Sequence, residues 1–242
     1  MQFTASLNDQ IEQVKTELKI EDQNFIGVFL YGSQNYGLSY EESDIDSIVL
    51  IGNCDKPKQE LTTPYGKTKI YTLKYFLYRL KQGDMECYEI LYTKYKIINS
   101  IYEEIFMDFV KSFSSCMDYE RVKRSLSIKL NEHLCHILWL MTNKEHARYN
   151  KKRLYWAIRV QNQLERIIAG ESYADSLIYH SSEDINLICI KTVVNYLSPQ
   201  EFLKIYKFLI EYYEKLPRYA KDISLQEEEC FSTFYNRMNE WR

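Results

Sequence analysis

Two aspartates one residue apart, shortly after a Gly-Ser pair, are the residues of this sequence best suited to chemistry. The stretch Tyr31–Leu50 reads YGSQNYGLSYEESDIDSIVL and contains Gly32, Ser33, Asp44 and Asp46. A chain that turns sharply at Gly-Ser presents backbone N–H groups and the Ser33 hydroxyl to one space, and such a set of donors suits a phosphate. Carboxylates two residues apart on a strand lie on the same face. The pattern predicts two oxygen ligands beside a phosphate-binding turn.

Oxygen ligands at this spacing suit Mg²⁺, which takes few protein carboxylates and completes its shell with water and phosphate oxygens. Two such ions about 4 Å apart can activate an attacking hydroxyl and stabilise a pyrophosphate leaving group. We therefore expect nucleotidyl transfer from a nucleoside triphosphate (NTP), with Mg²⁺ or Mn²⁺ bound by Asp44 and Asp46. A solvated pair of acids at a strand edge is the alternative, and the Gly-Ser turn at the fixed spacing disfavours it.

These residues require one strand before the turn and another after the aspartates. FIGVFL at residues 25–30 is nearly all apolar and predicts the first strand, residues 45–51 predict the second, and residues 67–73 predict a third. Six of the seven glycines lie in the first 83 residues, and the rest of the chain has helical periodicity. The expected fold class is α/β (α+β): a small mixed-sheet nucleotidyltransferase core over residues 1–111, followed by an all-α substrate or acceptor domain over residues 112–242.

Helix-start and helix-stop signals support this division. Residues 7–18 are predicted to form the first helix, and Gly83 and Gly170 are expected to end later ones. Capping boxes are predicted to start helices at Ser100, Ser198 and Ser224.

Composition limits the classes of protein that fit. The formal net charge of -3 over 242 residues argues against coating nucleic acid by bulk charge. Six cysteines without a CxxC pair are expected to be reduced core thiols. The chain begins with no leader pattern and contains no apolar run of roughly 18 residues, so we expect a cytoplasmic protein without a membrane span.

The segment resembles the nucleotidyltransferases related to DNA polymerase β, whose signature is GS followed by DxD on the next strand. More narrowly, Tyr31-Gly-Ser33, Tyr36-Gly-Leu38 and Ser43-Asp-Ile-Asp46 are similar to the pattern GSxxYGLxxxxSDxD. That pattern is found in a predicted nucleotidyltransferase family that includes RNA-repair-associated polymerase-β-like proteins of bacteria and phages. The resemblance extends loosely through IYTLKYFLYRLKQGD, CYEILYT and KRLYWAIRVQNQLERIIAG, so it covers residues 7–170.

The resemblance implies a nucleotide site formed by Gly32, Ser33, Tyr36 and Ser43, although Tyr36 could equally cover the strand end as packing. It also implies a third carboxylate on a neighbouring strand, where KTKIYTL contains no acid. Glu89 in CYEILYT is the candidate to complete the catalytic set with Asp44 and Asp46. A capping or salt-bridging role is the alternative for Glu89, and Asp84 and Glu86 are weaker substitutes for it. If none of them serves, activity is expected to be low, Mn²⁺-dependent or lost.

A second concentration of functional residue types lies on a later helix. Lys152, Arg159 and Arg166 are spaced seven apart and therefore share a face, next to Tyr155 and Trp156. Basic and aromatic side chains together can bind an RNA backbone and bases, or a triphosphate. An ordinary solvated face is the alternative. A further set, His133, Cys135 and His136, has zinc-ligand residue types but no second ligand pair, so core or surface roles are favoured.

The leading hypothesis is a nucleotidyltransferase that acts on an RNA end, with tRNA among the candidate acceptors. A protein hydroxyl, as used by nucleotidylating toxins, and a small molecule such as an aminoglycoside stay open as acceptors. The hypothesis from another class is a catalytically inactive nucleotide- or RNA-binding scaffold, motivated by the missing third acid. A purely structural interaction protein fits the retained GS and DxD pattern less well.

Overall fold

The structure is a computed structural model that describes residues 2–32, 35, 44–143, 147–177, 194, 196–219 and 223–240. The chain forms two compact units, one made of Met1–Asp118 with Ile223–Arg242 and the other of Tyr119–Asp222. This division differs from the predicted 1–111 and 112–242. The reason is that α4 (Ser100–Cys116) runs through residue 111 without a break, and that α10 (Leu225–Glu240) packs on α4 as part of the first unit.

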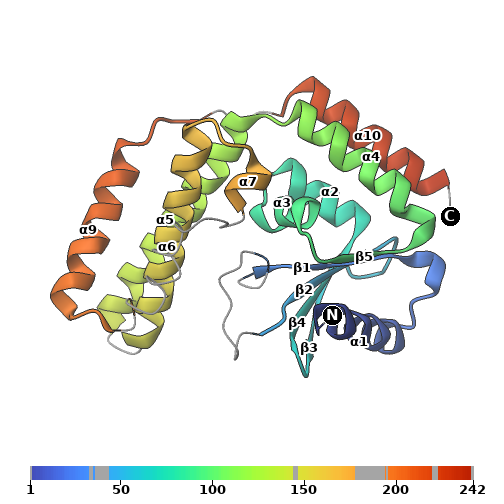
Figure 1. The fold of residues 1–242 in the computed structure, drawn as a ribbon, viewed down its shortest axis with the longest axis horizontal. Helices are drawn as coiled ribbons and strands as arrows, with labels where there is room; N and C mark the ends of the chain where they lie inside the picture. Colours follow the sequence, from blue (N-terminus) through green and yellow to red (C-terminus); the bar gives the residue numbers. More distant parts are fainter. Residues whose placement is uncertain are drawn as a thin grey trace. The chain divides into compact units, whose positions relative to one another are not determined.

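The first unit is built on a five-stranded mixed sheet with the strand order β3-β4-β2-β1-β5 (Figure 1). The strands are β1 (Phe25–Leu30), β2 (Ser47–Ile51), β3 (Lys58–Thr63), β4 (Gly66–Thr72) and β5 (Lys96–Ile98). β2 and β4 are parallel, whereas the pairs β1–β2, β1–β5 and β3–β4 are antiparallel. The predicted fold class, a small mixed-sheet core accompanied by helices, is confirmed.

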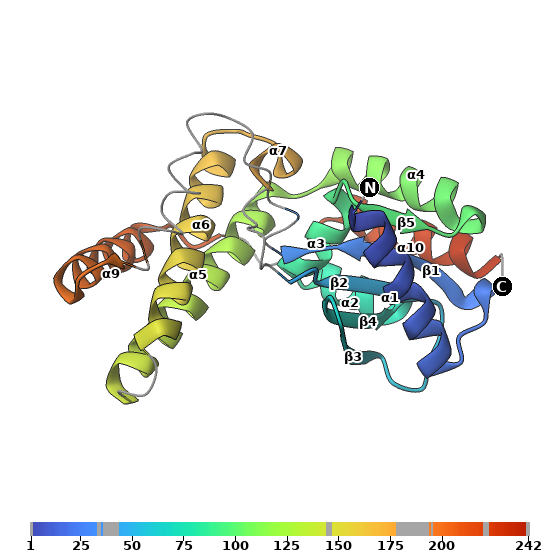
Figure 2. The ribbon, with the colours of Figure 1, turned by 60° about the horizontal axis from the view of Figure 1, so that its bottom comes forward.

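Helices cover both faces of this sheet. α1 (Gln2–Leu18) lies on one face, where Leu7, Ile11 and Val14 pack against apolar side chains of β1, β2 and β4. On the other face lie α2 (Leu73–Lys81), α3 (Met85–Tyr92) and α4 (Figure 2). There the ring of Phe29 in β1 lies 5.1 Å from the ring of Phe106 in α4. Because both faces are covered, β1 and β2 are buried at every position.

The second unit is entirely helical in its described part. It contains α5 (Tyr119–Asn143), α6 (Ala147–Ile168), the short α7 (Tyr173–Leu177) and α9 (Pro199–Lys215). α5 and α6 pack along one another, and α9 contacts both. The Tyr206 hydroxyl in α9 donates a hydrogen bond of 3.2 Å to the Leu134 carbonyl in α5. Among the described residues, no helix is both long enough and apolar enough to cross a membrane.

Most helix ends follow the predicted signals. Ser198 and Ser224 begin α9 and α10 with the predicted capping boxes, and Gly83 and Gly170 have positive φ angles of 77° and 95° after α2 and α6. The prediction at Ser100 was wrong by one residue. Asn99 is the N-cap of α4, because its side-chain oxygen accepts the hydrogen bond of the Ile101 N–H at 3.2 Å.

The cysteines depart from the predicted set of core thiols. Cys87 is buried, Cys116 and Cys230 are partly exposed, and Cys54 and Cys135 are exposed. These five are free thiols, and Cys189 lies outside the described residues.

Candidate functional site

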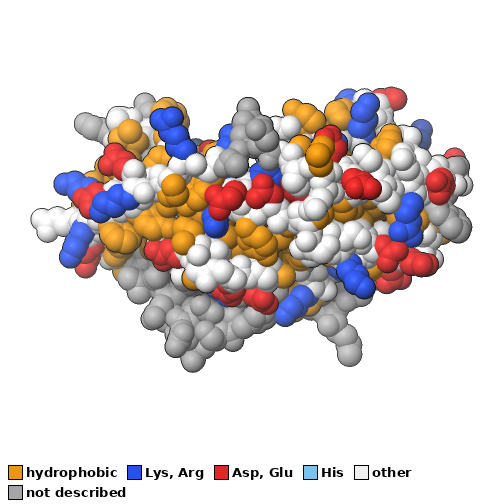
Figure 3. Space-filling view, turned by 90° about the horizontal axis from the view of Figure 1, so that it is seen from above, with side chains coloured by type: hydrophobic (Ala, Val, Ile, Leu, Met, Phe, Trp, Pro, Cys, Tyr) orange, Lys and Arg blue, Asp and Glu red, His pale blue; other side chains and the backbone are white. Residues whose placement is uncertain are grey.

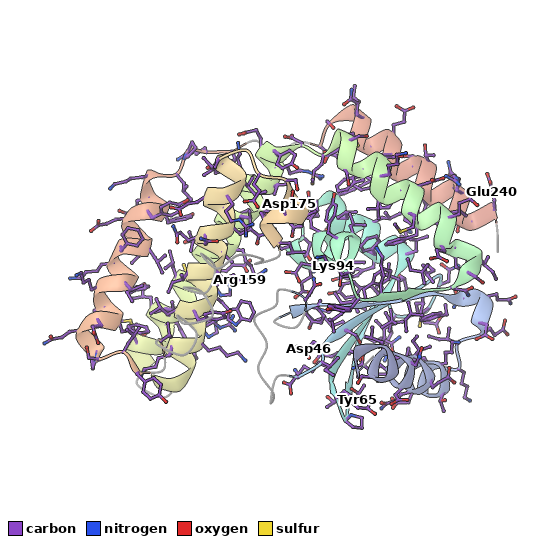
Figure 4. The ribbon with its side chains drawn as sticks, viewed as in Figure 1. Asp46, Tyr65, Lys94, Arg159, Asp175 and Glu240 are labelled. Atoms are coloured by element: carbon purple, nitrogen blue, oxygen red, sulfur yellow. The ribbon has the colours of Figure 1, made fainter. Side chains whose placement is uncertain are left out.

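The two segments that carry the predicted chemistry meet at one end of the sheet. β1 ends at Leu30, which pairs with Ser47 at the start of β2, so the residues just beyond β1 lie beside those just before β2. The Tyr31 N–H donates a hydrogen bond of 3.1 Å to the Asp46 carbonyl. A Cβ added to Gly32 would lie 3.8 Å from Asp46 Oδ2. Gly32 and the carboxylate of Asp46 are therefore neighbours, at the sheet end shown in Figure 4.

The turn after β1 depends on backbone freedom at Gly32 and on one buried side chain. Gly32 has a φ of 80°, a conformation that residues with a Cβ rarely adopt. The Asn35 N–H bonds to the Gly32 carbonyl at 3.0 Å, and the Asn35 side-chain oxygen accepts a bond of 2.7 Å from the Thr93 hydroxyl. The turn is thus tied to the end of α3. Ser33, Tyr36 and Ser43 lie outside the described residues, so their nucleotide-binding roles stay predictions.

The Asp46 carboxylate is held from the neighbouring strand. Its Oδ1 accepts a hydrogen bond of 2.9 Å from the Lys67 N–H at the start of β4. A Cβ on Gly66 would lie 3.0 Å from Asp46 Oδ1 and 2.9 Å from the Ile45 carbonyl oxygen. The backbone of residue 66 can therefore come this close to Ile45 and Asp46 only because residue 66 is glycine. The other carboxylate oxygen, Oδ2, is the one nearest to Gly32. Asp46 is thereby oriented with one oxygen toward the turn.

Asp44 and Asp46 precede β2 rather than lying within it, which corrects the predicted strand start at residue 45. β2 begins at Ser47, the first residue that pairs with both Leu30 of β1 and Thr68 of β4. The segment is instead held by Ile45, whose N–H donates to the Tyr65 carbonyl and whose carbonyl accepts from Gln10 Nε2, both at 2.8 Å. Ile45 is half-buried, and Asp44 is exposed.

On β4, the strand parallel to β2, the side chains that share a face with Tyr71 are lysines and not acids. Thr68 contacts Ser47 at 3.1 Å between hydroxyl oxygens, so the neighbouring Lys69 points to the opposite face of the sheet. The Lys69 ammonium lies 2.7 Å from Glu86 Oε1 and 4.8 Å from the centre of the Tyr31 ring. The Tyr71 hydroxyl donates to the other Glu86 oxygen at 2.9 Å.

The Tyr31 hydroxyl is influenced by carboxylates from several segments of this unit. Burial raises the pKa of Tyr31 well above its usual value, and the negative charges of Asp46, Glu86 and Glu89 raise it further. Asp46, which directly precedes β2, and two acids of α3 therefore act on the same hydroxyl. Neither Tyr31 nor Lys69 was predicted from the sequence, because ring and ammonium meet only through the pairing of β1, β2 and β4.

Three acids of α3 and its N-cap were considered as the third carboxylate. Asp84 caps α3 by accepting from the N–H groups of Glu86 and Cys87, and it also pairs with Arg79. Glu86 binds Lys69 and Tyr71. Glu89 is buried in α3 with 5% exposure. Within the described residues, no group of three or more His, Cys, Asp or Glu side chains could hold a metal ion. Glu89 does not form such a group with Asp44 and Asp46.

The three predicted substrate-binding residues belong to α6 of the second unit and have different surroundings. Lys152 is exposed, whereas Arg159 is 6% exposed and its guanidinium lies 5.3 Å from the Trp156 ring. Arg166 pairs with Glu171 and donates to the backbone carbonyls of Asp175 at 2.9 Å and Ser176 at 3.3 Å. Arg166 thus ties α7 to the end of α6. On the face shown in Figure 3, Lys and Arg side chains are interspersed with Asp and Glu.

The histidines of α5 have ordinary structural environments. His133 is 6% exposed, and Arg153 Nη1 lies 3.5 Å from its Nδ1. Burial, with the positive charges of Lys129, Arg153 and Arg159, lowers the pKa of His133 to about 3. The ring is therefore neutral at physiological pH. Cys135 is exposed, and no three-ligand group includes these side chains within the described ranges.

No family model matches the chain, and no curated protein matches it. Among solved structures, the chain is similar to the crystal structure of a nucleotidyltransferase-like protein from Exiguobacterium sibiricum 255-15. The alignment has 10% sequence identity and a TM-score of 0.32, and it covers 96% of this chain and 78% of that chain. This likeness is too distant to assign a function to the chain.

Proposed function

We propose that this protein is a metal-dependent nucleotidyltransferase, which moves a nucleoside monophosphate from an NTP to an acceptor hydroxyl. The observation that carries the proposal is the position of the Asp46 carboxylate beside Gly32, where a Cβ would lie only 3.8 Å from Oδ2. A glycine turn that can approach phosphate and a carboxylate that can bind metal are the two parts this reaction requires at one place.

The residues present fit a divalent cation held by two carboxylates. Asp46 Oδ1 is engaged by the Lys67 N–H, while Oδ2 is directed toward the turn, and the Asp44 side chain is exposed two residues earlier. Mg²⁺ commonly binds through one or two protein carboxylates and substrate phosphates, and when bound it neutralises charge on the reacting phosphate. Gly32 and Ser33 would position the triphosphate, and the Lys67 N–H would keep Asp46 in its orientation. Positioning of the two substrates supplies much of the expected rate enhancement.

For the acceptor we propose an RNA end, with tRNA among the candidates. The support is the resemblance of residues 31–46 to the polymerase-β-like pattern of RNA-repair-associated proteins. Lys152 is the exposed member of the predicted basic face of α6 and is the residue there that we assign to the acceptor. A protein hydroxyl or a small molecule is the alternative acceptor.

The test is transfer of label from each α-labelled NTP to a mixture of cellular RNA and protein, with Mg²⁺ or Mn²⁺. We expect the wild type to transfer label. Asp46→Asn should transfer it at least about 100-fold more slowly, which is the usual effect of removing one group that stabilises charge in the transition state. The matched control is Asp55→Asn, which makes the same change at an exposed acid in the β2–β3 connection. Ribonuclease or protease sensitivity of the label identifies the acceptor class.

A second candidate function, a nucleotide-binding scaffold without catalysis, is favoured by the absence of an acid from β4. Lys67 and Lys69 stand on that strand, and Lys69 is bound to Glu86. A scaffold predicts that wild type and Asp46→Asn both bind NTP and that neither releases pyrophosphate with either metal. Pyrophosphate release by the wild type alone would exclude it.

A further inference from the structure

α4 and α10 pack in antiparallel directions, although the whole second unit separates them in the sequence (Figure 1). Four contacts between the two helices fix their register. In these contacts the residue number rises along α10 as it falls along α4, so the helices are antiparallel. The four contacts are Asp118 with Glu227 at 3.1 Å, Phe113 with Phe231 at 5.4 Å between ring centres, Phe109 with Phe234 at 4.0 Å between ring centres, and Asp108 with Arg237 at 2.9 Å.

This register brings two cysteines to the same level. Cys116 lies between Phe113 and Asp118 at the end of α4, and Cys230 lies between Glu227 and Phe231 in α10. The Cys116 thiol, which lies 3.5 Å from the Phe113 carbonyl, is among the groups that raise the pKa of Cys230. Both are free thiols and both are partly exposed, so a small molecule in solution can reach them.

We propose that Cys116 and Cys230 form a redox modification site, which becomes an intramolecular disulfide by exchange with a small disulfide of the glutathione type. The proposal rests on the packing of α4 against α10 and is independent of the proposed function. The opposed thiols are the reactive groups, and the antiparallel register is what keeps them opposed.

The exchange proceeds in two balanced steps. The Cys116 thiolate attacks one sulfur of glutathione disulfide, which breaks that S–S bond, forms a mixed disulfide at Cys116 and releases one glutathione thiolate. Cys230 then loses its proton to solvent and attacks the Cys116 sulfur, which forms the protein disulfide and releases the second glutathione thiolate. Two protein thiols are oxidised, one glutathione disulfide is reduced, and the two thiol protons end on the two released glutathiones.

The order of the steps follows from the surroundings of Cys230. Burial raises its pKa to about 12, with further contributions from Cys116 and Glu227. Cys230 is therefore protonated at neutral pH and is a poor first nucleophile. As the second thiol it attacks a sulfur that is already beside it.

The disulfide would join the two points at which the chain leaves and re-enters the first unit. The second unit, Tyr119–Asp222, starts three residues after Cys116 and ends eight residues before Cys230. A covalent bond at this position holds α10 against α4 during local opening, since the helix can no longer separate from its partner. We expect the oxidised protein to exchange the amide hydrogens of α10 more slowly than the reduced protein.

The experiment treats the full-length folded protein with defined ratios of reduced and oxidised glutathione, followed by acid quench, alkylation and tryptic mapping. The diagnostic product is a linked pair of peptides, residues 112–121 with residues 222–237. Cys116→Ser and Cys230→Ser should both abolish it, and Cys230→Ser should accumulate a glutathione adduct at Cys116. Replacement of the exposed Cys54 and Cys135 by serine, as the matched control, should leave the linked pair unchanged.

Hydrogen exchange provides a second readout. Oxidation should slow exchange in residues 225–240 by at least tenfold in the wild type, and dithiothreitol should reverse this. Cys230→Ser treated in the same way should show no slowing. The proposal is overturned if glutathione disulfide in excess yields only separate adducts at Cys116 and Cys230, or if the linked pair appears only after the chain is unfolded in urea.

Discussion

At the scale of single residues, Gly66 explains how the Asp46 carboxylate can reach the backbone of β4. With no side chain on residue 66, Asp46 Oδ1 accepts the Lys67 N–H at 2.9 Å, and the Ile45 carbonyl lies close by. Two of the three atoms nearest to an added Cβ belong to the backbone of Ile45, and backbone atoms cannot rotate away. The identity of residue 66 is therefore coupled to the orientation of Asp46.

We predict that Gly66→Ala destabilises the protein by about 1–3 kcal/mol, the usual range for overpacking, and displaces the Asp46 carboxylate. Urea unfolding measures the loss of stability, and the rate of nucleotidyl transfer measures the displacement. The matched control is Gly170→Ala, where φ is 95° but no atom lies within 4 Å of the added Cβ. That variant should cost only about 1 kcal/mol, the conformational penalty, and leave transfer unchanged. Normal transfer by Gly66→Ala would contradict the coupling.

His133 makes stability depend on pH in a defined direction. Its folded-state pKa is lowered to about 3 while an unfolded chain has the ordinary value near 6.5, so the unfolded state binds more protons between these values. Stability is therefore fully present above pH 6.5 and is lost as the pH falls toward 3, with a slope of up to about 1.4 kcal/mol per pH unit from this residue.

Urea unfolding of wild type and His133→Gln at several pH values between 3 and 7 tests this expectation. Glutamine is polar and does not titrate, so its curve should be flatter by the contribution of His133. His136→Gln is the control, because His136 is only partly buried and the same substitution there should change the slope less. Parallel curves for wild type and His133→Gln would show that His133 is not buried in the neutral form.

At the scale of secondary structure, local sequence predicts the elements that have strong local signals. The nearly all-apolar run FIGVFL makes β1 recognisable in the sequence. Gly83 and Gly170 mark helix ends because a positive φ favours glycine. β3 was missed, since KQELTT is a polar edge strand that exists through its pairing with β4. β5 has only three residues and depends on β1 in the same way.

The contacts of the candidate site also divide into those that the local sequence predicts and those that it does not. Antiparallel strands on either side of a turn bring Gly32 to Asp46, so this approach could be predicted from residue order. The contacts of Gln10, Gly66 and Lys69 join segments far apart in the chain and have no local signal. Arg166 shares a helix face with Lys152, but the sequence does not reveal that the chain after α6 folds back to occupy its guanidinium.

The start of α9 offers a test at this scale. The Ser198 side chain accepts the Glu201 N–H at 3.3 Å, and Glu201 accepts the Ser198 N–H at 2.8 Å. We predict that Ser198→Ala destabilises the second unit by about 1 kcal/mol, because an N–H of the first turn loses its partner. The Ser198 hydroxyl also donates to the Glu201 carboxylate at 2.7 Å, and this bond, together with the one from the Ser198 N–H, lowers the pKa of Glu201. The substitution removes the hydroxyl and should therefore raise that pKa toward its ordinary value.

Urea unfolding and NMR titration of Glu201 measure the two effects. Gln200→Ala is the control, since residue 200 is exposed in the same helical turn and does not cap it. An unchanged pKa of Glu201 in Ser198→Ala would mean that the capping box does not persist in solution.

At the scale of the whole molecule, the first unit is assembled from two separated pieces of chain. α10 packs on α4, and its Phe231, Phe234 and Met238 side chains are all buried. The ring of Phe231 also contacts Phe109 and Phe113, with centres 6.0 and 5.4 Å apart. The stability of the sheet-containing unit therefore depends on residues that follow the helical unit in the sequence.

We predict that Phe231→Ala lowers the free energy of unfolding of the first unit by about 3–5 kcal/mol, the range for a buried phenylalanine. Tyr235→Ala removes an aromatic ring that is 37% exposed on the same helix, where Phe231 is 1% exposed, and should cost about 1 kcal/mol or less. Hydrogen exchange followed by mass spectrometry resolves where the loss occurs. Protection should fall in α2, α4 and the sheet of the Phe231 variant and stay unchanged in residues 119–177. An equal loss in both units would mean that they unfold as one, and that the return of α10 does not make the first unit a separate folding body.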